Sequence, residues 1–222
     1  GGIKVTMISV DNILDVEQYL DDVEGVIFDL DDTLYSEKDY VKSGYKVVAR
    51  LLGDEALADR LWIYFENGKP AIDKVLNELG CIGRKEECME AYREQMPEIK
   101  LYDGVVELIL ELKSKGIKVG IITDGRVTGQ KRKLQALGLD KLIDDIIITD
   151  ELGSTQFRKP CDIAFRIIQR RWELPFEQMV YVGDNAEKDF QAPKQLGMRS
   201  IFLRNKEGIY FDNSENDVQK NR

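Results

Sequence analysis

The stretch on which the fold depends is Val23-Glu24-Gly25-Val26-Ile27-Phe28-Asp29-Leu30-Asp31-Asp32-Thr33-Leu34. Its first half is short, apolar and rich in β-branched residues, which is typical of a strand buried on both faces. An isolated D-x-D pair is weak evidence, because such pairs more often serve as helix N-caps or exposed turns. This pair, however, directly follows a buried strand, and open parallel sheets bind their ligands at the carboxyl ends of strands.

Strand-like and helix-like segments alternate along the rest of the chain. Further apolar runs lie at 117–122, 146–148, 179–182 and 200–203. Helical patterns lie between them at 103–116 (with Asp103 as a possible N-cap), 126–137, 162–172 and 186–196. Pro193 falls inside the last of these and should kink or shorten it. The alternation predicts an α/β fold: a Rossmann-like parallel sheet with helices on both faces.

One long segment breaks this rhythm and defines the expected domains. Residues 36–100 show no strand pattern but repeat apolar residues at helical spacing, which predicts an inserted helical subdomain. The α/β core then comprises residues 23–35 and 101–204, followed by a polar tail over residues 205–222. Residues 1–22 form an N-terminal extension that either pairs with the sheet or connects to an upstream domain of a longer chain.

Composition excludes several kinds of chemistry and partner. The 222 residues include no histidine, so a Ser–His–Asp triad and imidazole metal ligands are ruled out. The formal charge of −9 and the pI near 4.8 argue against nucleic acid and anionic membranes as partners. No apolar run approaches the roughly 20 residues that span a bilayer. The three cysteines form no C-x-x-C pair, which fits reduced thiols and a cytoplasmic location.

Polar residues recur where the other predicted strands end. The second strand leads into Thr123-Asp124-Gly125, and the third precedes Arg158-Lys159-Pro160. The fourth ends in Gly183-Asp184-Asn185, with Asp189 five residues further on. A lysine taken alone is most often a solvated surface residue. Several strands that deliver hydroxyl, ammonium and carboxylate groups to one sheet edge are poorly explained by chance.

These motifs resemble those of the haloacid-dehalogenase-like (HAD) superfamily of hydrolases, in the phosphatase branch with a helical (C1-type) cap. The resemblance covers residues 23–203, and the first and fourth motifs together are specific. The family's motifs correspond to Asp29-Leu30-Asp31-Asp32-Thr33, to Thr123, to Lys159-Pro160, and to Gly183-Asp184 through Asp189.

The resemblance implies a mechanism and a cofactor. Asp29 would be the nucleophile that forms an aspartyl-phosphate, and Asp31 would be the general acid and base. Mg²⁺ would be held by Asp29, Asp184 and the Asp31 backbone carbonyl, with Asp189 behind them. Phosphate-binding and substrate-binding groups would come from Thr123, Asp124, Gly125, Arg126 and Lys159. The implied function is Mg²⁺-dependent hydrolysis of a small phosphorylated metabolite.

Two departures from the family pattern border the phosphate site. Asp124 stands where relatives often carry Asn, and the gap between Gly153 and Lys159 is longer than usual. These departures bear on substrate preference more than on the reaction class. Two alternatives remain open: a phosphomutase with the same site, or a weakly active phosphate-binding domain of a larger protein. Tyr35, Tyr40 and Tyr45 either line the substrate side of the cap or, as we favour, pack within it. The substrate and the oligomeric state are not indicated.

Overall fold

The computed structural model describes residues 7–209, and these fall into two compact units. One unit comprises residues 7–36 and 100–209, and the other comprises the helical segment Glu37–Ile99. Each unit is described by itself.

The first unit is built on a parallel sheet, as the sequence predicts. The described residues contribute six strands: β1 (Met7–Val10), β2 (Gly25–Phe28), β3 (Lys118–Thr123), β4 (Asp145–Ile148), β5 (Met179–Gly183) and β6 (Arg199–Leu203). Their order across the sheet is β1-β6-β5-β2-β3-β4, and every neighbouring pair is parallel. All four residues of β2 and all five of β5 are buried, which explains why these strands read as continuous apolar runs.

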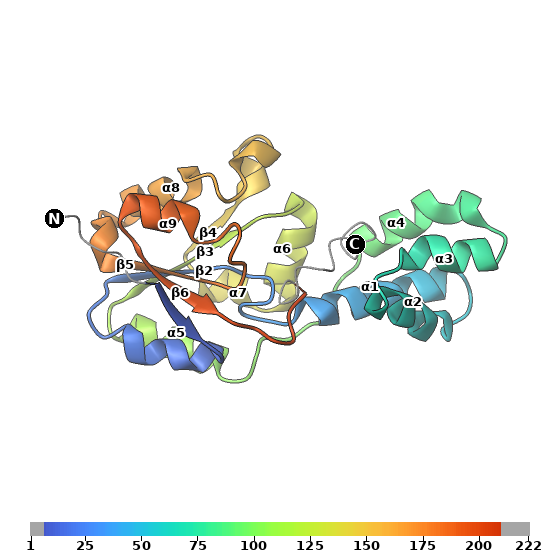
Figure 1. Ribbon diagram of the computed structural model, residues 1–222, viewed down its shortest axis with the longest axis horizontal. Helices are drawn as coiled ribbons and strands as arrows, with labels where there is room; N and C mark the ends of the chain where they lie inside the picture. Colours follow the sequence, from blue (N-terminus) through green and yellow to red (C-terminus); the bar gives the residue numbers. More distant parts are fainter. Residues whose placement is uncertain (1–6, 210–222) are drawn as a thin grey trace. The chain divides into compact units, whose positions relative to one another are not determined.

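Helices cover both faces of this sheet. They are η1 (Ile13–Tyr19), α5 (Val105–Ser114), α6 (Val127–Ala136), α7 (Leu139–Leu142), η3 (Thr149–Leu152), η4 (Thr155–Phe157), α8 (Ile163–Trp172), η5 (Phe176–Gln178) and α9 (Gln191–Leu196). Figure 1 shows α8 and α9 on one face of the sheet and α5 with η1 on the other. Across residues 7–209, no helix combines the length and the apolar character needed to cross a membrane.

The order of the strands places the first motif at the centre of the carboxyl edge. Phe28, the last residue of β2, lies level with Ile121 of β3 and Val182 of β5. From β2 the chain builds β3 and β4 on one side, then returns to build β5 and β6 on the other. This reversal is the topological switch point at which doubly wound sheets bind ligands.

The N-terminal extension contributes a strand to this sheet. β1 pairs with β6 in parallel, with Met7 level with Ser200 and Val10 level with Leu203. Of the two expectations for the extension, pairing with the sheet is the one seen in residues 7–10. Residues 1–6 lie outside the described part of the chain.

Two predicted helix starts are wrong by small, explicable amounts. α9 begins at Gln191 rather than at 186, and Pro193 lies in its first turn, where the missing N–H costs no intrahelical bond. The predicted shortening by this proline is therefore confirmed. Asp103 is not the N-cap of α5: Gly104 occupies that position with φ 86°, because the Val105 N–H first closes a turn onto the Tyr102 carbonyl.

The start of the predicted polar tail contacts the first motif. The Asn205 side chain donates to the Asp32 carbonyl at 2.8 Å, and the Ile209 N–H donates to the Asp32 carboxylate at 2.8 Å. Asp32 is fully buried and adopts a left-handed backbone, with φ 59°. Residues 205–209 therefore brace the turn that follows β2. The rest of the predicted tail, residues 210–222, lies outside the described residues.

The second unit is helical throughout its regular elements. It contains α1 (Glu37–Leu51), α2 (Leu57–Glu66), α3 (Ala71–Glu78), η2 (Ile82–Arg84) and α4 (Lys85–Arg93). Tyr40 and Tyr45 are buried and contact the ring of Tyr92 edge-on or tilted, which confirms that these two tyrosines are packing residues.

Candidate active site

Asp29 lies at the middle of the carboxyl edge of the sheet. Its N–H donates to the Val182 carbonyl at 2.8 Å, which continues the β2–β5 ladder by one residue. The side chain is buried, with 5% of the residue exposed. The parallel register therefore fixes both the position and the direction of this carboxylate.

Two further carboxylates converge on Asp29. Oxygen atoms of Asp29, Asp184 and Asp189 all lie within 4.8 Å of one another. The Thr33 hydroxyl lies between Asp29 and Asp184, at 3.5 and 3.4 Å. Burial, followed by repulsion from Asp189, raises the pKa of Asp29 to about 6 against the opposing pull of Lys159. Burial and the charges of Asp29, Asp32 and Asp189 raise the pKa of Asp184 well above its usual range.

Lys159 supplies a buried cation to this cluster. Its Nζ lies 2.8 Å from Asp29 Oδ1, 3.0 Å from Asp189 Oδ1 and 2.5 Å from the Tyr181 hydroxyl. Burial opposes the charge on this ammonium, but Asp189 and Asp29 hold its pKa well above the ordinary value. The solvated-surface interpretation of Lys159 is therefore wrong, since its side chain is 0% exposed.

The donor set fits a hard divalent cation. One ammonium does not balance three converging carboxylates, so negative charge is left over, and all the donors are oxygen atoms, which Mg²⁺ prefers. Asp189 already accepts from the Asn185 N–H at 2.9 Å as well as pairing with Lys159. Asp29 and Asp184 are the carboxylates better placed to ligate. A Cβ on Gly183 would lie 2.5 Å from Asp189 Oδ2, so this close approach requires glycine.

Asp31 occupies a different environment, although only one residue separates it from Asp29. Its carboxylate accepts from the Tyr35 hydroxyl, from Lys133 Nζ at 2.8 Å and from Gln130 Nε2 at 2.9 Å. Burial alone would raise the pKa of Asp31, but the Lys133 charge and these donors lower it to about 2. The sequence analysis missed Gln130 and Lys133; their spacing of three residues on a predicted helix is the signal that places them on one face.

Of the remaining predicted residues, Thr123 and Gly125 lie against Gln130, whereas Arg126 is exposed. Thr123 is fully buried, and its hydroxyl accepts from Gln130 Nε2 at 2.6 Å. Gly125 has φ 139° and packs against Gln130. Arg126 is exposed at the start of α6, outside this group of contacting side chains.

Asp124 is held by protein groups. It accepts from the Thr149 hydroxyl at 2.8 Å and the Lys159 N–H at 3.1 Å, and it pairs with Lys188 at 3.2 Å. Burial acts to raise the pKa of Asp124, but Lys159 and Lys188 outweigh it and hold that pKa below its usual value. The sequence analysis also missed Lys188, because a lysine in a loop carries no pattern that distinguishes it from a surface lysine.

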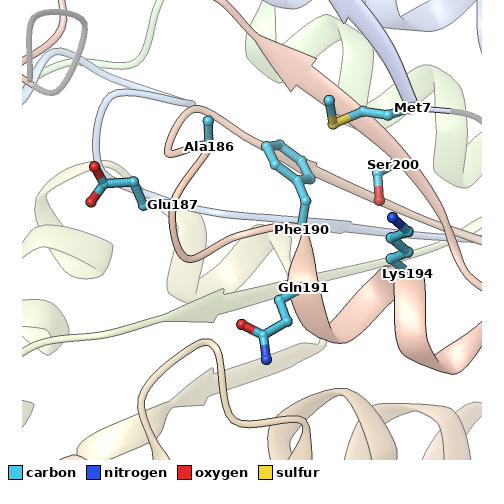
Figure 2. Close-up of a pocket in the computed structure, with 7 residues that line it drawn as sticks. All are labelled: Met7, Ala186, Glu187, Phe190, Gln191, Lys194 and Ser200. Atoms are coloured by element: carbon cyan, nitrogen blue, oxygen red, sulfur yellow. The ribbon is translucent and has the colours of Figure 1, made fainter.

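A separate cavity borders the loop that carries Asp184 and Asp189. Its volume is about 360 Å³. Figure 2 shows the residues that line it: Met7, Ala186, Glu187, Phe190, Gln191, Lys194 and Ser200. None of the residues predicted from the sequence lines this cavity.

Comparison with known proteins agrees with the motifs. Residues 26–203 match the family described as haloacid dehalogenase-like hydrolase. A glyceraldehyde 3-phosphate phosphatase of Methanocaldococcus jannaschii is 29% identical over 214 residues, covering 88% of this chain and 90% of that protein. A ribulose-1,5-bisphosphate 5-phosphatase of Halopiger xanaduensis is 24% identical over 206 residues, covering 81% and 84%.

A solved structure supports the fold. The HAD hydrolase YfnB of Bacillus subtilis, determined with bound magnesium, superposes with a TM-score of 0.60 at 20% identity, covering 82% of this chain and 87% of that one. The helices inserted between β2 and β3 correspond to the expected helical cap branch. Given the family match, the sheet topology and the placement of the motifs, the chain belongs to the haloacid dehalogenase-like hydrolases and is a phosphatase of the helical-cap branch.

Proposed function

We propose that the protein is a Mg²⁺-dependent phosphomonoesterase that acts on a small phosphorylated sugar through an aspartyl-phosphate intermediate. The observation that carries the proposal is the Asp29 carboxylate, paired with buried Lys159 at 2.8 Å beside two further carboxylates. We also propose that residues 36–100 act as the cap and that specificity resides there.

Asp29 is the proposed nucleophile. One of its oxygens attacks phosphorus, the bond to the leaving alcohol breaks, and the phosphoryl group becomes attached to the Asp29 carboxylate. Lys159 and the Thr123 hydroxyl hold phosphoryl oxygens, with backbone N–H groups near Leu30 and Asp31 assisting. The leaving alcohol takes its proton from Asp31, which then accepts a proton from water in the second half of the reaction.

Asp29, Asp184 and the Asp31 carbonyl are the groups that would hold Mg²⁺, with Asp189 fixing Lys159 behind them. A bound Mg²⁺ supplies positive charge that offsets the carboxylates and stabilises the transferring phosphoryl group. Asp124 is proposed to support the phosphate site by fixing the Lys159 backbone, and Gly125 by making room for Gln130. Of the predicted substrate contacts, Arg126 is the one whose side chain is exposed.

The substrate class rests on the relatives. Two relatives that match most of this chain are named as a glyceraldehyde 3-phosphate phosphatase and a ribulose-1,5-bisphosphate 5-phosphatase. We therefore propose phosphorylated sugars, with glyceraldehyde 3-phosphate the first to test. Small phosphorylated metabolites of other classes belong in the same panel.

The test is hydrolysis of para-nitrophenyl phosphate, then of a panel of phosphorylated metabolites, with and without Mg²⁺. Asp29→Asn should reduce turnover to background, because an amide cannot form the aspartyl-phosphate. Asp144→Asn is the matched control, since Asp144 is exposed and lies outside the site. Equal activity of Asp29→Asn and wild type would refute the mechanism; phosphate binding by an inactive wild type would favour the binding-domain alternative.

A further inference from the structure

Two residues on α6 and one that follows the first motif enclose the Asp31 carboxylate. We infer that Tyr35, Gln130 and Lys133, the Asp31 cradle, are positioning residues that present one particular oxygen of Asp31 for proton transfer. The inference rests on the proposed function, in which Asp31 is the acid and base. What is new is that three residues orient the Asp31 carboxylate and that Oδ2 is the oxygen available for proton transfer.

The donors divide unequally between the two oxygens of Asp31. Oδ1 accepts from both the Tyr35 hydroxyl and Lys133 Nζ, whereas Oδ2 accepts from Gln130 Nε2 alone among the described residues. A carboxylate oxygen has two lone-pair positions in its plane. Oδ1 is therefore filled, and Oδ2 retains one position that can take or give a proton.

Gln130 links this oxygen to the phosphate-binding hydroxyl. Its side-chain NH₂ has two hydrogens, and it donates to Asp31 Oδ2 at 2.9 Å and to Thr123 Oγ1 at 2.6 Å. Because Thr123 Oγ1 accepts this bond, its own hydrogen points elsewhere and is available to a phosphoryl oxygen. One amide thus orients both the proton-transfer oxygen and a phosphate donor.

The burial of the cradle argues for a function beyond solubility. Gln130 is 3% exposed and Lys133 is 6% exposed, although both lie on a helix whose neighbouring Lys131 points outward. An apolar residue at position 133 would pack without the cost of desolvating an ammonium group. Gly125 makes room for the arrangement, since a Cβ there would lie 2.9 Å from the Gln130 side chain.

The Asp31 cradle serves both halves of the proposed reaction, and the second half is the hydrolysis of the Asp29 phosphate. A water oxygen attacks phosphorus of the Asp29 phosphate, and the bond between phosphorus and the Asp29 oxygen breaks, which regenerates the carboxylate. The water proton passes to Asp31 Oδ2, and inorganic phosphate leaves. In the first half of the reaction the same oxygen gives its proton to the departing alcohol.

The experiment compares Lys133→Met and Lys133→Arg with Lys131→Met, an exposed lysine two residues away on the same helix that pairs with Glu151 at 3.7 Å. Two substrates separate the two halves of the reaction. Para-nitrophenyl phosphate has a leaving group that needs little protonation, so kcat/KM reports formation of the aspartyl-phosphate without the acid. A burst of nitrophenol in the first turnover identifies hydrolysis as the slower step, and kcat then reports hydrolysis. With glycerol phosphate, formation also requires the acid.

For Lys133→Met we expect kcat on the aryl substrate to fall about tenfold, with a parallel fall in KM. General acid–base catalysis accelerates a reaction about 10²–10⁴-fold, and this variant keeps the Asp31 carboxyl group and loses only part of its orientation. On glycerol phosphate kcat/KM should also fall. Lys133→Arg should recover most of the loss, and Lys131→Met should match wild type.

Two results would overturn the inference. One is Lys133→Met behaving as Lys131→Met. The other is an equal fall in kcat for both substrates with KM unchanged, which is the signature of fewer folded molecules. Activity absent from the wild type itself is a different failure, since it removes the proposed function and this inference together.

Discussion

Asp29 and Asp31 are separated by one residue and have opposite surroundings. On the β5 side of the motif, burial and the charge of Asp189 raise the pKa of Asp29 to about 6, although Lys159 and the more distant Lys188 act to lower it. On the α6 side, an ammonium, an amide and a hydroxyl outweigh burial and lower the pKa of Asp31 to about 2. On the β5 side three carboxylates meet and positive charge is too little to balance them, whereas on the α6 side Lys133 balances the single carboxylate of Asp31.

The largest expected effect is the loss of Lys159, the ammonium that contacts Asp29 and Asp189. Lys159→Met leaves Asp29 and Asp189 buried without their ammonium, so we expect the free energy of unfolding to fall by about 3–5 kcal/mol. Urea unfolding with Mg²⁺ removed by a chelator measures this change. Lys131→Met, an exposed lysine, provides the control. A cost below about 1 kcal/mol, the range of a surface ion pair, would mean that the two sides do not differ as described.

A smaller effect is expected from moving Asp189. Gly183→Ala places a Cβ 2.5 Å from Asp189 Oδ2, so Asp189 and the Lys159 it holds must shift. We expect Mg²⁺ affinity to fall about 10–100-fold, as for other groups that orient metal ligands. Titration with Mg²⁺ by calorimetry measures it. Gly83→Ala is the matched control, because a Cβ there meets nothing within 4 Å; equal affinities of the two variants would contradict the assignment of Asp189.

The smallest expected effect is a pH dependence confined to the Asp29 side. Without metal, Asp29 is mostly protonated below pH 6, so Mg²⁺ must displace a proton, and the apparent affinity should fall up to about tenfold per pH unit below that value. The raised pKa of Asp29 also means that its contribution to stability is present below about pH 4 and is lost as pH rises through 6. Asp31, with its lowered pKa, contributes in the opposite sense, and that contribution is lost as pH falls from about 4 to 2.

Calorimetry at pH 5, 6 and 7 in buffers of different ionisation enthalpy counts the protons released on Mg²⁺ binding. We expect more protons to be released at pH 5 than at pH 7, because Asp29 ionises between these values. Release that does not change with pH would show that the Asp29 side is already ionised without metal.

The sequence predicts the sheet and the residues at its carboxyl edge because both depend on local pattern. Buried parallel strands read as apolar runs; Thr123 ends one of these strands, and Asp29 and Asp184 each follow one directly. Gln130 and Lys133 are different, since polar residues on a helix look alike whether they face solvent or a carboxylate. Their inward direction is set by how α6 packs on the sheet, which no window of sequence contains. The sequence does not decide whether residues 7–10 join the sheet for a related reason: a four-residue edge strand carries little pattern of its own.

The pairing of Asp29 with Lys159 spans 130 residues of chain, the contact of Thr33 with Asp184 spans 151, and the bond from Ile209 to Asp32 spans 177. Each of these contacts must wait until its later residue has left the ribosome, and the last of them requires a residue that follows β6. Contacts this distant in sequence are slow to form, because the chain between them must first be ordered. The proposed catalytic centre is consequently among the last features to assemble during synthesis, and an incomplete chain carries Asp29, the proposed nucleophile, without Lys159 and Asp184. Phosphatase activity in a nascent population would thus report completed molecules.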